Sequence, residues 1–255
     1  MNEVEESVAQ AIGAWRAYAA PLPAHEFQEQ PGLSIAWGNA DLAFYNAIFL
    51  TDRLAGSADR AVRFMGERKV PGMLLLCESL ASEHLAGGGL PPDLVVSFEL
   101  TGMASDRLVP PVAPRPLPEY RRTNNSELAA ALSDINSHAY GSDVESGRAV
   151  MANPLLWGGD TWGYVAFEGD RPVASAATFL IDGRLYVALV ATEPDAQRRG
   201  YAEGVMRYSL AEASAATGVS RMVLHATAAG RPIYERMGFH DTARFTAYMK
   251  TPLSH

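Results

Sequence analysis

The sequence predicts a mixed α/β fold, in which helices pack on a sheet that contains both parallel and antiparallel strands. Segments with apolar residues at helical spacing alternate with short strand-like runs along the 255 residues. Residues 163–192 contain three such runs joined by the tight turns Gly169-Asp170 and Asp182-Gly183, which predicts an antiparallel meander. A strand, a loop and a helix then follow in direct succession, as expected where helices cover a sheet.

The first half of the chain alternates helices and strands. Val4, Val8 and Ile12 recur at helical spacing, and Pro21 ends the helix that they predict. The other elements expected in this half are strands at 33–38 and 44–51, a helix over 57–68 with Ser57 as N-cap, a strand at 73–79, a short helix to Leu85, a break at 87–89 and a strand at 94–100.

A cluster of prolines marks the clearest boundary in the sequence. Residues 109–120 hold five prolines, each of which lacks an N–H and restricts the residue before it. We therefore expect an extended, proline-rich linker there. It separates an N-terminal domain, residues 1–108, from a C-terminal domain, residues 121–255.

The second half predicts a regular order of elements. After two helices, the meander strands lead into an alanine-rich helix, a further strand and a short helix. The expected bounds are helices at 126–139 and 143–152, strands at 163–169, 171–181 and 184–192, a helix to Thr217, a strand at 221–227, a helix at 231–237, and a final pair of strands after Gly238.

Charge and composition exclude several functional classes. Residues 1–120 carry 15 acidic and 8 basic residues, a net charge of −7 out of −8 for the whole chain. A protein that tracks nucleic-acid phosphates needs a basic face, so no nucleic-acid partner is expected. The acidic half would instead favour a cationic small molecule.

Neither a membrane nor an oxidising compartment is expected. No apolar run approaches the roughly 18 residues that a membrane span needs, and the acidic N-terminus does not resemble a secretory signal. The single cysteine, Cys77, cannot form an internal disulfide and is compatible with the reducing cytoplasm. We therefore expect a cytoplasmic protein, either a monomer or a homodimer.

The residues that carry chemistry lie between the third meander strand and the alanine-rich helix. Gly200 allows a backbone to approach a ligand without a Cβ in the way. The first N–H groups of the following helix have no partner within it, and with the helix dipole they form an anion site. Arg198 and Arg199 add positive charge that suits a diphosphate.

These residues and a second motif resemble a known family. Gln-Arg-Arg-Gly-Tyr-Ala at 197–202, followed by Tyr-Glu-Arg-Met-Gly-Phe at 234–239, resembles the GNAT superfamily of acetyl-CoA-dependent N-acetyltransferases. The resemblance covers residues 121–250 and implies the GNAT acyl-CoA N-acyltransferase fold. It also implies a split between the strand that ends near Thr192 and the strand at 221–227.

The resemblance assigns roles to individual positions. Acetyl-CoA would be the cosubstrate, with its pantetheine arm in the split and no metal ion involved. The residues that would contact it are the backbone of Val190, Ala191 and Thr192 for pantetheine, and Gln197, Arg198, Arg199, Gly200, Tyr201 and Ala202 for the pyrophosphate, with Thr227 where many members have asparagine. Tyr234 matches the tyrosine that donates a proton to the leaving thiolate.

The sequence departs from the family pattern at the position of the general base. Members with a glutamate on the strand after the long helix have no counterpart here, because residues 221–227 contain no carboxylate. Glu168, His225 or a chain of water molecules could serve instead, and the sequence leaves these alternatives open.

The first half resembles a degenerate GNAT-like half, which suggests two GNAT-like halves in tandem. Its order of elements fits, but it has no equivalent of the loop at 197–202. We therefore expect one cofactor site per chain, with the N-terminal domain shaping the acceptor pocket.

The sequence is compatible with three functions. The first is transfer of an acetyl group to a small-molecule amine by direct attack in a ternary complex. The alternatives are a non-catalytic acyl-CoA-binding or regulatory module, and a peptide or protein N-acetyltransferase. The six histidines are scattered without the spacing of metal ligands, so no metal site is expected.

Overall fold

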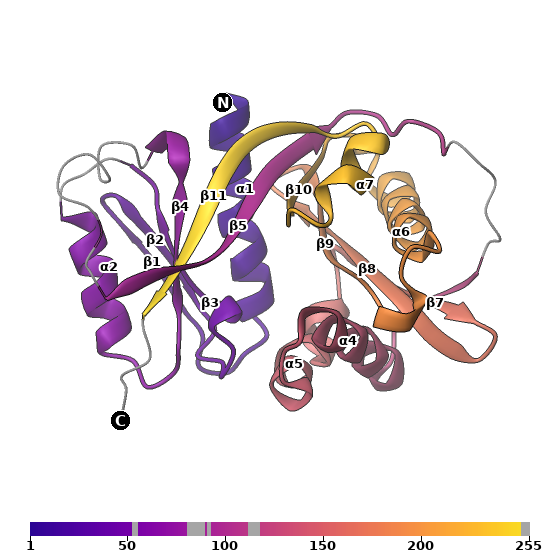
Figure 1. The fold of residues 1–255 in the computed structure, drawn as a ribbon, viewed down its shortest axis with the longest axis horizontal. Helices are drawn as coiled ribbons and strands as arrows, with labels where there is room; N and C mark the ends of the chain where they lie inside the picture. The colour runs from indigo at the N-terminus through magenta and orange to yellow at the C-terminus, as the bar shows by residue number, and fades with distance from the viewer. Residues whose placement is uncertain (53–55, 81–89, 91–92, 112–117, 251–255) are drawn as a thin grey trace. The chain divides into compact units, whose positions relative to one another are not determined.

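The computed structural model describes residues 1–52, 56–80, 90, 93–111 and 118–250 (Figure 1). The chain forms two compact units. Unit 1 consists of Met1–Met103, Ala226–Arg231 and Asp241–His255, and unit 2 of Ala104–His225 and Pro232–His240. The fold is mixed α/β, as predicted.

Unit 1 is a mixed sheet with the strand order β1-β2-β3-β4-β11-β5. Neighbouring strands are antiparallel from β1 to β3 and between β4 and β11, whereas β3 and β4 are parallel. Its elements are α1 (Glu3–Ala19), β1 (Glu26–Gln30), β2 (Leu33–Trp37), a short 3₁₀ turn (Ala43–Tyr45), β3 (Asn46–Leu50), α2 (Ser57–Gly66), β4 (Met73–Cys77), β5 (Leu94–Ser105) and β11 (His240–Lys250).

The core of unit 1 lies on both faces of this sheet. On one face, Ala61 and Met65 of α2 pack against Ile48 and Leu74 of β3 and β4. On the other face, the buried Trp15 of α1 makes an edge contact with Phe49 of β3, the residue next to Ile48. Successive strand residues point to opposite faces, so α1 and α2 cover opposite sides of β3.

Unit 2 holds the predicted meander and the two strands beside it, in the order β10-β9-β8-β7-β6. Strands β6 to β9 are antiparallel, and β10 joins β9 in parallel. Its elements are β6 (Glu119–Arg122), α4 (Ser126–Tyr140), α5 (Val144–Met151), β7 (Thr161–Glu168), β8 (Arg171–Ile181), β9 (Arg184–Thr192), α6 (Tyr201–Thr217), β10 (Met222–Ala226) and α7 (Arg231–Arg236), with 3₁₀ turns at Pro154–Trp157 and Pro194–Ala196.

Helices α4 and α6 cover opposite faces of the meander (Figure 1). Ser175 of β8 accepts a hydrogen bond from Asn136 of α4 at 2.9 Å. Thr178, three residues further along β8, is hydrogen-bonded to Ser209 of α6 at 2.8 Å. Side chains three apart on a strand point to opposite faces, which agrees with the placement of the two helices.

The turns of the meander have the geometry that their sequences predict. Asp182 and Gly183 both have positive φ, at 47° and 71°, as a two-residue hairpin of the right-handed sheet requires. Gly169, in the turn before β8, is also left-handed, with φ 61°.

Two local predictions in the sequence are wrong. Ser57 is the first helical residue of α2, and the N-cap is Gly56, whose φ of 79° needs no side chain to bend the chain into the helix. The predicted final strand pair is the single strand β11, because residues 240–250 contain no glycine, proline or asparagine to form a turn. Strand β1 was not predicted, since its sequence Glu-Phe-Gln-Glu-Gln is mostly polar.

The predicted domain boundaries differ from the grouping of the chain in space. Asp241–His255 belong to unit 1, because β11 pairs with β4, for example Phe245 opposite Cys77. The helix expected before Leu85, the break at 87–89 and residues 112–117 of the expected linker lie outside the described residues.

Candidate functional site

Helix α6 begins without a side-chain cap among the described residues. Gly200 is its N-cap, with φ 86° and ψ 7°. Arg198, two residues earlier, is also left-handed at φ 61°. Gln197, Arg198 and Arg199 are exposed, and Gly200, Tyr201 and Ala202 are half-buried. The backbone N–H groups at this helix start therefore fit an anionic group such as a pyrophosphate.

Glu168, at the end of β7, holds this loop in place. Both Arg199 and Tyr201 bind its carboxylate: Arg199 Nη1 donates to Oε2 at 3.1 Å, Arg199 Nη2 donates to Oε1, and the Tyr201 hydroxyl donates to Oε1 at 2.8 Å. The Arg199 guanidinium also lies 5.1 Å from the centre of the Tyr201 ring. The hydrogen bond from Tyr201, followed by that from Arg199, lowers the pKa of Glu168.

This arrangement makes Glu168 a poorer base than an isolated glutamate. A carboxylate that accepts several hydrogen bonds prefers its ionised form and takes up a proton less readily. Its partners belong to the predicted anion loop, so its contacts fit a role in shaping that loop.

The parallel pair β9 and β10 separates part-way along its length. Pairing runs from Leu185 opposite Met222 to Val187 opposite Leu224 and then stops. The predicted pantetheine-binding residues, Val190–Thr192, lie beyond the last paired position of β9, and their contact with the cosubstrate stays a prediction.

A bulge in β9 accompanies the separation. Leu189 has φ 52° inside a strand, and the register with β8 shifts between Ser175 and Ala177. The Leu189 carbonyl accepts hydrogen bonds from the Ser175 hydroxyl at 3.0 Å and from Asn136 Nδ2 at 3.4 Å. A left-handed leucine is unfavourable, so the buried polar contacts around it hold the bulge in place.

Two side chains at the end of α4 also contact the open part of β9, and sequence reasoning missed both. The Tyr140 hydroxyl donates to the Val190 carbonyl at 3.2 Å. His138 Nδ1 lies 3.0 and 3.2 Å from the two carboxylate oxygens of Glu193. These contacts span about 50 residues of sequence. Their only local signal was two polar aromatic side chains in the last turn of a helix.

Tyr234, the predicted proton donor, lies in α7 among other phenols of unit 2. Burial, followed by the neighbouring Tyr140, raises the pKa of Tyr234. Burial and the neighbouring Tyr234 likewise raise the pKa of Tyr186, whose hydroxyl is hydrogen-bonded to His225 Nδ1 at 2.9 Å. These phenols therefore keep their protons at neutral pH, as a proton donor must.

Thr227 differs from the other predicted site residues, because it belongs to unit 1. Its hydroxyl accepts a hydrogen bond from the Gly230 N–H at 3.2 Å, and its carbonyl accepts from Gly230 and Arg231 at 3.0 Å each. The side chain thus forms the turn before α7, and its contact with the cosubstrate stays a prediction.

The sequence of this region matches a known domain family. Residues 138–247 match the family model described as "Acetyltransferase (GNAT) domain". The loop at 197–202, the bulge at Leu189 and Tyr234 all lie inside the matched region.

Solved structures with the same fold match nearly the whole length of this chain. A GCN5-related N-acetyltransferase from Kribbella flavida matches with a TM-score of 0.73 at 17% identity, over 99% of this chain and 97% of the other. A GCN5-related N-acetyltransferase from Sphaerobacter thermophilus matches with a TM-score of 0.54 at 14% identity, over 86% and 76%. A GCN5-related N-acetyltransferase-like protein from Streptococcus suis matches with a TM-score of 0.54 at 12% identity, over 98% and 99%.

These similarities establish the GNAT acyl-CoA N-acyltransferase fold that the sequence predicted. No curated protein sequence matches the chain. The prediction of two GNAT-like halves in tandem stays a prediction.

Neither a metal site nor a membrane-spanning helix is found in the part of the chain that the structure describes. In these residues, no three histidine, cysteine, aspartate or glutamate side chains gather as metal ligands would. No helix there is long and apolar enough to cross a membrane.

Proposed function

We propose that the protein is an N-acetyltransferase that moves an acetyl group from acetyl-CoA to a small-molecule amine. The observation that carries this proposal is the uncapped, left-handed start of α6 at Gly200, inside a domain whose sequence matches acetyltransferases. The pairing of β9 with β10 ends at Val187, before the residues proposed to bind pantetheine.

Acetyl-CoA would bind as a substrate along β9 and at the start of α6. The backbone of Val190–Thr192 would pair with its pantetheine amides, as a neighbouring strand would. The N–H groups of residues 197–202 would hold its pyrophosphate. When bound, the thioester supplies an electrophilic carbonyl and a thiolate leaving group, and the protein binds and orients both reactants.

Tyr234 would act as the proton donor to the leaving group. Its raised pKa keeps the phenol protonated at neutral pH. A thiol is far more acidic than an alcohol, so its thiolate leaves with only mild assistance, and a hydrogen bond from a phenol supplies it. The reaction needs no acyl-enzyme, and the buried Cys77 has no part in it.

The proposal also covers the acceptor, the cellular compartment and the oligomeric state of the protein. A small cationic amine in the cytoplasm, with the protein as a monomer or homodimer, agrees with the acidic composition and the single cysteine. The two other functions, a non-catalytic acyl-CoA-binding module and a peptide acetyltransferase, are outcomes that the following experiment distinguishes.

The test is a thiol-release assay with acetyl-CoA and a panel of amines, together with calorimetric binding of acetyl-CoA. The panel contains ethanolamine, spermidine, tyramine, an aminoglycoside, amino acids and short peptides. Thiol release with a small amine supports the proposal. Release only with peptides favours the peptide enzyme. Binding without release favours the non-catalytic module, and absence of binding rejects all three.

A further inference from the structure

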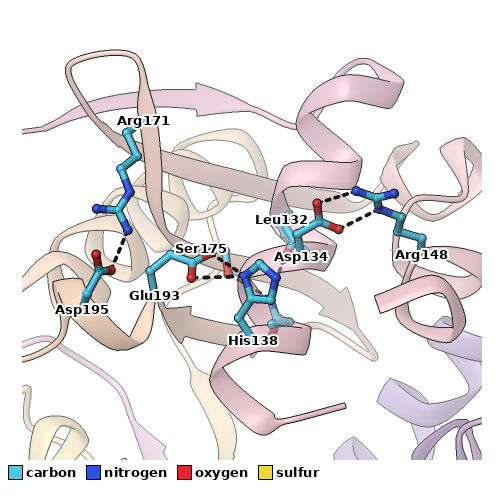
Figure 2. Close-up of polar contacts among 9 residues, drawn as sticks. Leu132, Asp134, His138, Arg148, Arg171, Ser175, Glu193 and Asp195 are labelled. Atoms are coloured by element: carbon cyan, nitrogen blue, oxygen red, sulfur yellow. Dashed lines mark hydrogen bonds and ion pairs between the residues drawn. The ribbon is translucent and has the colours of Figure 1, made fainter. Parts of the chain in front are cut away.

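A histidine–glutamate pair lies at the end of β9, outside the groups assigned above (Figure 2). His138 is in the last turn of α4, and Glu193 directly follows β9. The imidazole Nδ1 lies 3.0 Å from Glu193 Oε1 and 3.2 Å from Oε2. The Glu193 side chain is 15% exposed, whereas the His138 side chain is 48% exposed. The Glu193 side chain is thus mostly buried, while the His138 ring reaches solvent.

The contact fixes which ring nitrogen can accept a proton. A carboxylate only accepts hydrogen bonds, so the nitrogen that faces it, Nδ1, carries a hydrogen. A neutral imidazole then has its free lone pair on Nε2. Within the described residues both hydrogen bonds of the His138 ring use Nδ1.

The pair lies beside the strand that we propose to hold the acetyl donor. Glu193 follows Val190–Thr192 without a break, and three residues of extended chain span about 10 Å. Tyr140, two residues after His138, donates to the Val190 carbonyl. Helix α4 packs on the face of the meander opposite α6, so the pair reaches β9 from the side away from the helix of the anion loop (Figure 1).

Figure 2 shows two further ion pairs, one on α4 and one at the end of the meander. On α4, Asp134 binds Arg148 of α5 in a two-pronged ion pair at 2.7 Å for each contact. At the end of the meander, Arg171 binds Asp195 at 2.5 Å. Glu193 is the carboxylate that contacts His138 directly.

We infer that His138 is the general base that deprotonates the amine acceptor and that Glu193 is its positioning residue. The inference rests on the proposed acetyltransferase function. His138 Nε2 takes one proton from the acceptor ammonium, and the neutral nitrogen attacks the thioester carbon. The C–N bond forms, the C–S bond breaks, and the thiolate receives a proton from Tyr234. The amide nitrogen gives its second proton to Tyr234, and His138 releases the first to solvent.

The alternatives for this role are engaged elsewhere. Glu168 accepts hydrogen bonds from Arg199 and Tyr201, which lower its pKa and weaken it as a base. His225 is joined through Nδ1 to the Tyr186 hydroxyl. A tyrosine hydroxyl can either donate or accept, so it does not fix the tautomer of His225 as a carboxylate fixes that of His138.

The decisive experiment compares two kinds of nucleophile in the full-length H138Q variant. The first is the primary amine that gives the highest turnover in the panel, which is a cation at pH 7. The second is hydroxylamine, which is uncharged at pH 7 and needs no base to expose its lone pair. H138Q should lose about 100-fold in kcat/KM with the amine and less than about 3-fold with hydroxylamine. An equal loss with both nucleophiles, or no loss with either, overturns the inference.

H240Q is the matched control, since His240 is also exposed and lies in unit 2. It should retain wild-type rates with both nucleophiles. Raising the pH should restore part of the H138Q rate with the amine, because more of the acceptor is then neutral. A rate that stays flat with pH contradicts the assigned role.

A measurement without acetyl-CoA tests the pair itself. In ¹⁵N-labelled wild-type protein, nuclear magnetic resonance should show His138 with the hydrogen on Nδ1 at neutral pH. In E193Q the hydrogen should no longer be fixed on Nδ1, because a glutamine side chain can donate as well as accept a hydrogen bond, and kcat/KM with the amine should fall. A wild-type ring with its hydrogen on Nε2, or a tautomer that is unchanged in E193Q, overturns the assignment of the pair.

These outcomes separate the inference from the function on which it rests. If the wild-type protein releases no thiol with any amine, the proposed acetyltransferase function fails. If the wild-type protein is active and H138Q matches it, only the role of His138 fails.

Discussion

The parallel pair β3–β4 of unit 1 and the parallel pair β9–β10 of unit 2 differ in how far their pairing extends. In unit 1, β3 and β4 pair over four consecutive positions, from Ala47 opposite Met73 to Leu50 opposite Leu76, and every residue of both strands is buried. In unit 2, β9 and β10 pair over three positions and then separate. A complete pair satisfies its own backbone groups, whereas an interrupted pair leaves groups that a ligand can use.

Each unit also has a buried asparagine that ties distant backbone groups together. In unit 1, Asn46 Nδ2 donates to the carbonyls of Ala40 and Pro71 at 2.6 Å each, and its Oδ1 accepts from the Ala40 N–H at 3.1 Å. In unit 2, Asn136 donates to Ser175 and to the bulged Leu189. Asn46 ties loops to the end of the regular pair β3–β4, whereas Asn136 stabilises the bulge at Leu189 in β9.

The largest expected effect comes from breaking the predicted anion loop at the start of α6. Gly200→Glu adds a side chain at φ 86° and a negative charge where a pyrophosphate is expected. We expect acetyl-CoA binding to weaken by more than about 100-fold in calorimetry. Gly56→Glu is the matched control, because Gly56 is a left-handed N-cap in unit 1. It should lose stability without losing binding, and unchanged binding in G200E would remove the loop from the site.

The next largest effect concerns Tyr234. Tyr234→Phe removes the hydroxyl and keeps the ring, so acetyl-CoA binding should stay within about 3-fold while turnover falls by about 100-fold. Steady-state kinetics and calorimetry on the same preparation separate the two quantities. Tyr208→Phe, in an exposed tyrosine stacked on Tyr120, is the control and should leave both unchanged. Full turnover in Y234F contradicts the role of proton donor.

A smaller effect should distinguish the two asparagines. Asn136→Ala and Asn46→Ala each leave buried carbonyl groups without their donor, which costs about 1–3 kcal/mol of unfolding free energy in denaturant titration. Only Asn136→Ala should also weaken acetyl-CoA binding, by about 10-fold, since it releases the Leu189 bulge. If both variants bind equally well, the bulge has no part in the site.

The smallest effect concerns the carboxylate that holds the loop. The pKa of Glu168 is lowered in the folded protein, so its contacts stabilise the fold above the ordinary glutamate value of 4.5 and are lost as pH falls through the folded value. Glu168→Gln should therefore lower the melting temperature slightly at pH 7 and converge with the wild type at acid pH, which flattens the acid end of the curve of melting temperature against pH. A wild-type acid profile in E168Q would show that Arg199 and Tyr201 do not depend on this carboxylate.

How well each element could be predicted depended on how local its signal in the sequence is. The meander was predicted because its turns, such as Asp182-Gly183, encode their own geometry. The start of α6 was predicted because strand, glycine and helix are consecutive, whereas the role of residues 197–202 as an anion loop stays a prediction. Strand β1 was missed because polar residues do not show the alternation of a half-buried strand. The pairing of β11 with β4 could not be predicted, because β4 lies more than 150 residues earlier in the sequence.

The site was predictable to the same extent. The residues on the loop and in α7 follow one another in short motifs. The pair of His138 and Glu193, and the contact of Tyr140 with Val190, join residues about 50 positions apart. Their side-chain types are common at helix ends, and only the packing of α4 on β9 brings them together.

The pairing of β11 with β4 sets the order in which the protein can be completed during synthesis. Strand β4 leaves the ribosome well before the neighbour that covers its second edge, because Phe245–Met249 follow it more than 150 residues later in the sequence. Until then the apolar run Met73–Cys77 has a bare strand edge, a template for pairing with other chains. Unit 1 therefore cannot mature ahead of unit 2 on the ribosome, and premature termination would release a chain prone to aggregation.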